Sequence, residues 1–149
     1  MELQAVWHVY VRGDLVVIPT FSRATAGYFL DTEPVAVSSV RARDEFVRTL
    51  DATITTGNPR VPTPTRNCFP KPVVLRYAGV RSWKALESKA VCFTIQHFEG
   101  ALELSVTGRG DDGRWTDSPI EAVGFSDSAG SAGTVQRIIS RVSHEPNRT

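Results

Sequence analysis

The sequence predicts an α+β fold, an antiparallel sheet with two main helices, at about residues 39–56 and 131–143, packed on one face. The first forty residues are rich in the β-branched and aromatic types that favour strands. Two later segments place apolar residues at helical spacing, and segments of period two lie between them. Because strands and helices are grouped along the chain, we expect an antiparallel sheet rather than a doubly wound parallel one.

The composition is that of one globular domain covering residues 1–149. The chain is 41% hydrophobic and 22% charged, and its net charge of +1 argues against attachment to nucleic acid by general basicity. Its two cysteines cannot form a dense disulfide scaffold. The sequence shows neither a signal-peptide pattern nor an apolar run of membrane-spanning length. We therefore expect a cytoplasmic protein with no membrane partner.

The first elements are expected to be strands. Ala5–Val11 and Leu15–Ile18 flank Arg12-Gly13-Asp14, a natural turn sequence, and predict a β-hairpin. Further strands are predicted at Gly27–Asp31 and Val35–Val37.

The first main helix follows these strands and ends at a proline-rich segment. Val40, Val47, Leu50 and Ile54 form one apolar stripe, with Ser38 or Ser39 as the expected N-cap and with Gly57 and Pro59 as the stop. Residues 57–72 hold five prolines and are expected to form a surface connection, because proline removes an amide donor.

The second half repeats the pattern of strands followed by a helix. We predict a strand at 73–77 and a short helix at 82–86 capped by Ser82. A hairpin of 90–97 with 102–106 follows, and then a glycine-rich turn at 108–113. The last predicted elements are short strands at 114–116 and 120–124, a linker at 126–133 and a closing helix. Val135, Ile138, Ile139 and Val142 mark the apolar face of that helix, and 143–149 is expected to be a frayed tail.

Motifs for chemistry are missing from the sequence. It has no phosphate-binding loop, no dinucleotide fingerprint and no HExxH pair. Cys68 and Cys92 are too far apart, without neighbouring ligands, to indicate a zinc site with His97. We expect no catalytic residue, no metal and no cofactor. One alternative stays open: a small hydrolase-like enzyme using His97 with a carboxylate such as Asp117 or Glu103, since catalytic triads need no sequence proximity.

Charged residues are distributed unevenly along the chain, although the net charge is close to zero. Residues 60–89 hold seven basic side chains and one acidic one, whereas residues 99–127 hold seven acidic and two basic ones. The basic segment, which includes Tyr77 and Trp83, favours a second alternative, a nucleic-acid-binding domain. The acidic segment carries Trp115 and suits a basic protein partner, because carboxylates steer association and an aromatic side chain anchors it.

Several patches in the first 95 residues resemble immunity proteins of bacterial contact-dependent growth inhibition systems. They are Trp7–Val11, Leu15–Thr20, Ala26–Leu30, Gly57–Pro59 with Pro62–Pro64, Phe69–Leu75, and Tyr77–Val80 with Ser82-Trp83. The resemblance implies a protein that binds the toxic C-terminal domain of its cognate toxin in a one-to-one complex and blocks it, without direct contact to nucleic acid. Such toxins are frequently nucleases. The resemblance supplies no catalytic residues and transfers no contact positions.

The expected toxin-binding surface is therefore taken from the charge pattern. Nuclease active sites are commonly basic, so the acidic segment is the best match to such a partner. The predicted toxin-binding residues are Glu99, Glu103, Asp111, Asp112, Trp115 and Asp117.

Overall fold

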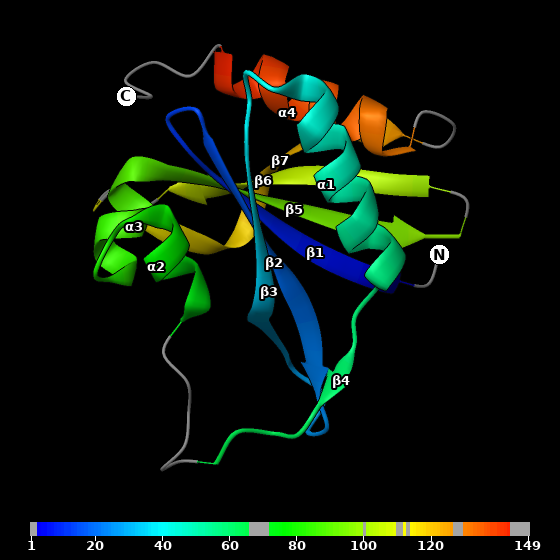
Figure 1. The fold of residues 1–149 in the computed structure, drawn as a ribbon, viewed down its shortest axis with the longest axis vertical. Helices are drawn as coiled ribbons and strands as arrows, with labels where there is room; N and C mark the ends of the chain where they lie inside the picture. Colours follow the sequence, from blue (N-terminus) through cyan, green and yellow to red (C-terminus); the bar gives the residue numbers. More distant parts are fainter. Residues whose placement is uncertain are drawn as a thin grey trace.

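The fold is an α+β arrangement built on one antiparallel sheet, as the sequence predicts (Figure 1). The computed structural model describes residues 3–65, 72–99, 101–109, 112, 114–126 and 130–143, without the side chains of Arg109 and residues 116–126. The described elements are β1 (Leu3–Arg12), β2 (Leu15–Ala24), β3 (Phe29–Ser39), α1 (Arg43–Thr56), β4 (Arg60–Val61), α2 (Val73–Ala78), α3 (Trp83–Lys89), β5 (Ala90–Phe98), β6 (Ala101–Arg109), β7 (Trp115–Ser126) and α4 (Gly130–Ser143).

The sheet has the strand order β3-β2-β1-β5-β6-β7, and each of these neighbours is antiparallel. Strand β1 lies inside the sheet and is covered on both faces. Trp7, Val9 and Val11 belong to one buried cluster, and Tyr10 belongs to another. Alternate side chains of a strand point to opposite faces, so the mainly apolar run from Ala5 to Val11, interrupted only by His8, matches a strand with a core on each side.

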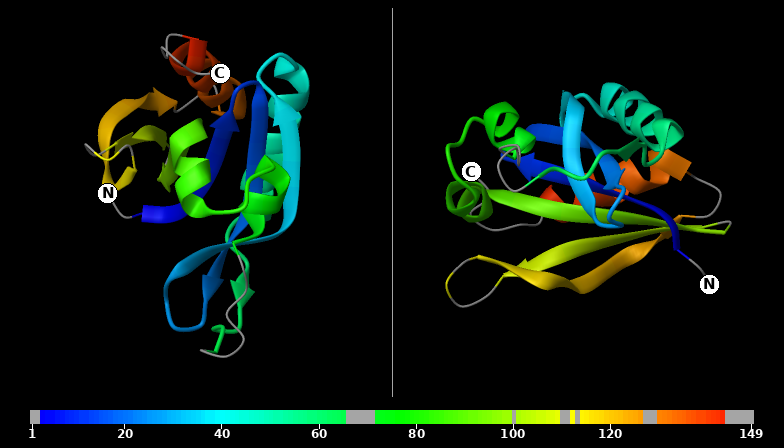
Figure 2. Two further views of the ribbon diagram at one scale, coloured as in Figure 1. Left: turned by 90° about the vertical axis from the view of Figure 1, so that its left-hand side faces the viewer. Right: turned by 90° about the horizontal axis from the view of Figure 1, so that it is seen from below.

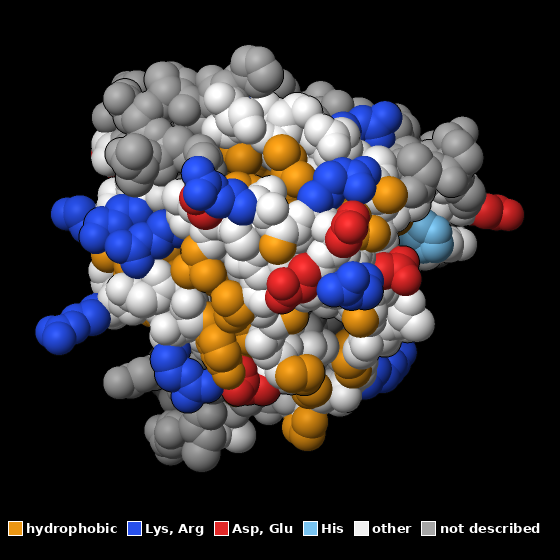
Figure 3. All heavy atoms as spheres, turned by 45° about the horizontal axis from the view of Figure 1, so that its top comes forward, with side chains coloured by type: hydrophobic (Ala, Val, Ile, Leu, Met, Phe, Trp, Pro, Cys, Tyr) orange, Lys and Arg blue, Asp and Glu red, His pale blue; other side chains and the backbone are white. Residues whose placement is uncertain are grey.

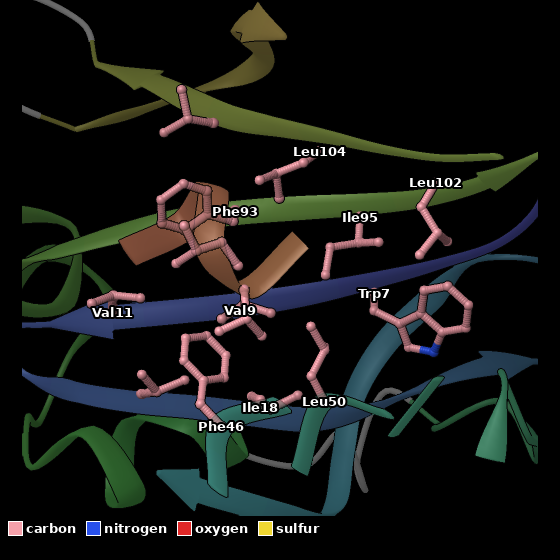
Figure 4. Packing of buried hydrophobic residues seen from close by; sticks show 14 of the residues in the cluster. Trp7, Val9, Val11, Ile18, Phe46, Leu50, Phe93, Ile95, Leu102 and Leu104 are labelled. Atoms are coloured by element: carbon pink, nitrogen blue, oxygen red, sulfur yellow. The ribbon is translucent and has the colours of Figure 1, made fainter. Parts of the chain in front are cut away.

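The larger core lies between the sheet and the two long helices. Phe46 and Leu50 of α1 are fully buried beside Val9 and Trp7 of β1 (Figure 4). Ile138 of α4 is fully buried in the same cluster. The apolar stripe predicted for each helix is the face that packs here. Both main helices therefore lie on one face of the sheet, as predicted.

The opposite face is covered by α2 and α3, and here one prediction is wrong. Residues 73–77, predicted as a strand, form helix α2, which packs Val74 and Ala78 against the second cluster. Their spacing of four residues places both on one helical face. Gly79 ends the helix with φ 73°, a conformation that glycine adopts freely. The guanidinium of Arg12 then donates to the carbonyl of Ala78 at 2.6 Å. These contacts outweigh the strand preference of the valines.

The connection after α1 is tied to the sheet by Asn58. Its amide nitrogen donates to the carbonyls of Val6 and Phe21, at 2.7 and 2.9 Å, and its amide oxygen accepts from the Val6 nitrogen. The side chain thus joins β1 to β2, whose own register is confined to residues 10–12 and 15–17. Beyond it, β4 pairs in parallel with the end of β2. Pro59 and Pro62 lie directly before and after this short strand.

Several predicted boundaries are wrong because tertiary pairing extends the elements. The segments 27–31 and 35–37, predicted as two strands, are parts of the single strand β3, which starts at Phe29. Helix α1 begins at Arg43 rather than near residue 39, because Ser38 and Ser39 still pair with β2. Neither serine caps the helix, whose N-cap is Ala42 without a side-chain bond.

The boundaries near the C-terminal end shift in the same way. Strand β6 continues through Gly108 and Arg109, which were predicted to lie in a turn, and β7 is one strand where two short ones were predicted. Helix α4 begins at Gly130, inside the predicted linker, and Ser131 donates to the carboxylate of Asp51 in α1 at 3.0 Å.

Ser82 caps α3 as predicted, accepting from the Ala85 nitrogen. The predicted tail from residue 144 onward lies outside the described residues.

None of the helices within the described ranges combines the length and the apolar character needed to cross a bilayer.

The buried thiol of Cys92 gives a test of the second core. Burial raises the pKa of Cys92 to about 12, and only the thiolate reacts readily with disulfide reagents. In a Cys68→Ser variant, we expect no reaction of the folded protein with an aromatic disulfide reagent at about pH 8 and full reaction in denaturant. Reaction of the folded variant at the unfolded rate would contradict the packing of α2 and α3 over β5.

Candidate interaction surface

The predicted toxin-binding residues that the structure describes do not all lie together. Glu99 is exposed at the turn between β5 and β6, at the end of the sheet where β5 finishes. Asp112 and Trp115 lie at the opposite end, where β7 begins. Strand β6 separates the two ends, and its nine residues span about 25–30 Å.

The remaining three residues are only partly placed. Glu103 lies within β6, half-buried, beside Gln96 of β5 and Phe125 of β7. Asp117 belongs to β7, but its side chain is not described, and Asp111 lies outside the described residues. The structure therefore brings Asp112 and Trp115 together and leaves Glu99 at the other end of the sheet.

The end of the sheet that carries Asp112 and Trp115 is held by Glu87 of α3. One oxygen of this buried carboxylate accepts from the Arg114 guanidinium at 2.9 Å, and the other accepts from the Trp115 nitrogen at 2.6 Å. Asp112 in turn accepts from the Arg114 nitrogen. The hydrogen bonds from Arg114 lower the pKa of Glu87, with the Trp115 amide adding to the effect, so the carboxylate stays charged at neutral pH.

Three aromatic rings join the same region to the second core. Trp115 lies 5.8 Å from the ring of Tyr10 and 6.2 Å from that of Trp83, measured between centroids. Both tryptophans are half-buried and pack against the second cluster. Each indole thus presents part of its surface to solvent from a fixed position, which suits an anchor in a protein interface.

A hollow of about 610 Å³ lies beside this region, between α2 and β3. Its apolar lining comes from Pro72, Val73, Leu75 and Val80. Its charged lining comes from Glu33, Arg76 and Arg81.

An ion-pair network fixes one side of the hollow. The Glu33 carboxylate accepts from Arg76 at 3.2 Å and from the Tyr77 hydroxyl at 2.9 Å. The guanidinium of Arg76 also lies 4.9 Å from the centroid of the Tyr77 ring.

We name the surface made by α2, α3, the hollow and the start of β7 the α2–α3 end of the molecule. Figure 2 shows it facing the viewer in the left panel, and it forms the left-hand side of Figure 1. Sequence reasoning missed the hollow, because it depends on residues 73–78 being helical. The available signal was the Val74–Ala78 spacing followed by Gly79.

The basic segment does not form one continuous face among the described residues. Arg60 lies on β4 at the end of β2, well away from α2 and α3 in Figure 1. Exposed Arg76, Arg81, Lys84 and Lys89 lie on or next to α2 and α3. Arg66 and Lys71 lie outside the described residues. This division does not provide the continuous basic groove that tracks a nucleic-acid backbone.

His97 is not part of a polar cluster among the residues described. It lies in β5 between Ala5 and Leu102, and no described side chain donates to it or accepts from it. Nor do the described ranges contain three or more His, Cys, Asp or Glu side chains grouped to hold a metal ion. The proposed hydrolase geometry around His97 therefore finds no support in the described part of the chain.

A different histidine belongs to a cluster that sequence reasoning missed. Tyr10 donates to Asp31 at 2.7 Å, and His8 Nδ1 lies 3.2 Å from the Tyr10 oxygen and 3.5 Å from Asp31. Burial, with a contribution from the Asp31 charge, raises the pKa of Tyr10 well above 10.0, so its hydroxyl stays protonated and donates. No described serine, threonine or cysteine is hydrogen-bonded to His8, and the cluster links β1 to β3 across β2.

Comparison with known proteins identifies relatives of the fold. No family model and no curated protein matches the sequence. A solved structure of a protein of unknown function from Neisseria meningitidis matches with a TM-score of 0.60 and 12% identity, over 95% of this chain and 99% of that one. A chain in the structure of a CdiA-CT/CdiI toxin and immunity complex from Yersinia pseudotuberculosis matches with the same TM-score and identity, over 94% and 99%. At this identity the likeness establishes a shared fold.

The Glu87 network predicts a pH-dependent contribution to stability. Replacing Glu87 by Gln should lower the free energy of unfolding by about 1 kcal/mol at neutral pH, because the charge-assisted bonds to a half-exposed Arg114 are lost. The pKa of this carboxyl is depressed in the folded state, so its stabilisation is present at neutral pH and is lost as the pH falls through the folded pKa, below the ordinary 4.5. Urea unfolding of both proteins at about pH 7 and about pH 3 should show the difference shrinking. An equal difference at both pH values would contradict the charged network, and Glu99→Gln serves as the exposed control.

Proposed function

We propose that this chain is a toxin-neutralising immunity protein of a contact-dependent growth inhibition system. It binds the C-terminal toxin domain of its cognate effector, a nuclease, in a one-to-one complex in the cytoplasm. It works by occupying a surface of the toxin and catalyses no reaction itself.

The observation that supports this proposal is the full-length correspondence of the fold. A chain of the Yersinia toxin and immunity complex is covered over 99% of its length, so the likeness extends across the whole domain rather than one common motif. The sequence patches from Trp7 to Trp83 point independently to the same class. The described residues also present mixed charges and half-buried aromatic rings, which are the components of a protein-binding surface.

The α2–α3 end is the docking surface that we propose. It combines the Asp112 carboxylate and the fixed indoles of Trp83 and Trp115 in one region. The rings supply contact area at little cost in side-chain entropy, because packing already holds them. The carboxylates contribute mainly to the rate of association.

The first test is protection of cells against the toxin. Co-expression of this chain with the toxin domain encoded beside its gene should restore growth, and the two proteins should co-purify in a one-to-one ratio. A catalytically inactive toxin domain, which needs no protection, allows the affinity to be measured by calorimetry. Growth arrest despite folded immunity protein, together with no co-purification, would rule out the proposed function.

The second test distinguishes between the two ends of the sheet as the docking surface. The double variant Asp111→Asn with Asp112→Asn changes the net charge by the same amount as Glu99→Lys and keeps an oxygen that accepts from the Arg114 nitrogen. We expect the double variant to slow association with the toxin domain several-fold and to weaken its dependence on salt, because charges at the rim of an interface act on the association rate. Glu99→Lys should leave both unchanged. The reverse result in stopped-flow measurements would place the docking surface at the opposite end.

A further inference from the structure

We propose that the hollow between α2 and β3 receives an apolar side chain from an acidic segment of the toxin domain. This inference rests on the proposed function and assigns the chemistry of one contact within it. Three observations support it: the lining of the hollow, its charge and the hydrogen-bonded turn beside it.

The lining is suited to an aliphatic or aromatic side chain. Val73 and Leu75 of α2, with Val80 after the helix, are half-buried and leave part of their surface open to the hollow. Figure 3 shows a band of hydrophobic side chains left of the centre of the face in view, with lysines and arginines further to the left. A volume of about 610 Å³ is large enough for such a side chain together with its flanking backbone.

The charged residues at the rim of the hollow favour an acidic residue next to the inserted apolar side chain. Two arginines and one glutamate line the hollow, and that glutamate already accepts from Arg76 and Tyr77. Arg81 is exposed, and no described carboxylate forms an ion pair with it. Lys84 adds a further exposed positive charge on α3. A carboxylate beside the buried apolar group would therefore meet a guanidinium able to form a bidentate pair.

The turn after α2, at one side of the hollow, is held by backbone and side-chain hydrogen bonds. Gly79 and Val80 close α2 by donating to the carbonyls of Arg76 and Leu75, and Arg12 donates to the carbonyl of Ala78. A Cβ atom at Gly79 would lie 3.3 Å from the Arg12 guanidinium, so the turn and the arginine are closely fitted. A preformed site binds with a smaller loss of conformational entropy than a flexible one.

A protein segment fits this site better than nucleic acid. Binding of single strands relies on aromatic faces on which bases stack. Here the apolar part of the lining is aliphatic, and the Tyr77 hydroxyl donates to Glu33. Trp83 and Trp115 are not among the residues that line the hollow. The hollow also adjoins these tryptophans through the short segment from Val80 to Trp83, so one partner can cover both.

The first experiment compares Arg81→Glu with Arg48→Glu, the same charge change at an exposed position on α1. Loss of the charge-assisted contact should weaken the affinity for the inactive toxin domain about tenfold or more for Arg81→Glu and leave it unchanged for Arg48→Glu. Circular dichroism and thermal unfolding check that both variants fold. Equal affinity of wild type and Arg81→Glu would overturn the inference while leaving the proposed function intact.

The second experiment probes the hollow without the toxin. Three hexapeptides are titrated into the isotopically labelled protein: two leucines flanked by aspartates, two leucines flanked by lysines, and two serines flanked by aspartates. We expect amide shifts at residues 73–81 with the first peptide alone, and their loss in Arg81→Glu. If the toxin domain fails to bind, the proposed function is contradicted. The peptide shifts still test the chemistry of the hollow in that case. No shifts with the first peptide, equal shifts with the lysine or serine peptide, or shifts at these residues only with single-stranded RNA would each overturn the inference.

Discussion

The burial of β1 on both faces is the constraint on which the rest of the structure depends. Its odd-numbered residues from Trp7 to Val11 pack beneath α1 and α4, and Tyr10 packs on the opposite face. A strand in this position needs cover on each side, because exposing either apolar face to water costs free energy in proportion to its area. The two long helices cover one face only, so a second layer must come from elsewhere in the chain.

That second layer is also what creates the candidate docking surface. Helices α2 and α3 cover Tyr10 and Cys92, and in doing so they place the hollow against β3 and Trp83 against Trp115. Glu87 then couples α3 to the start of β7 through Arg114 and the Trp115 nitrogen. The same contacts that complete the second core therefore hold aromatic and charged side chains at one end of the molecule, where they are accessible to a partner.

The candidate surface could be predicted only in part. Charge counting along the chain singled out Asp112 and Trp115, which do share one end of the sheet, but it grouped them with Glu99, which a strand of nine residues separates from them. Sequence proximity misleads here because β5 and β6 form a hairpin: residues at its turn lie far from residues at its open end. Two further features bring together residues distant in the sequence, so no local sequence pattern predicts them. They are the rim of the hollow, where Arg76 and Arg81 lie with Glu33, and the cluster of His8, Tyr10 and Asp31.

The sequence by itself determined the α+β class, the strand character of residues 5–11, 15–18, 90–97 and 102–106, and the apolar stripes of the two main helices. Alternation and helical spacing follow directly from which face of each element is buried. It also determined the cap of α3 at Ser82, which is a local hydrogen bond. Tertiary structure decided that residues 73–78 are helical, that β3 is one strand, and that Asn58 joins β1 to β2. Each of these outcomes depends on a partner distant in the chain. For α2 the partners are Arg12 and the second core, for β3 the length of β2, and for Asn58 the carbonyls of Val6 and Phe21. Contacts with these partners override the local preference of a short segment.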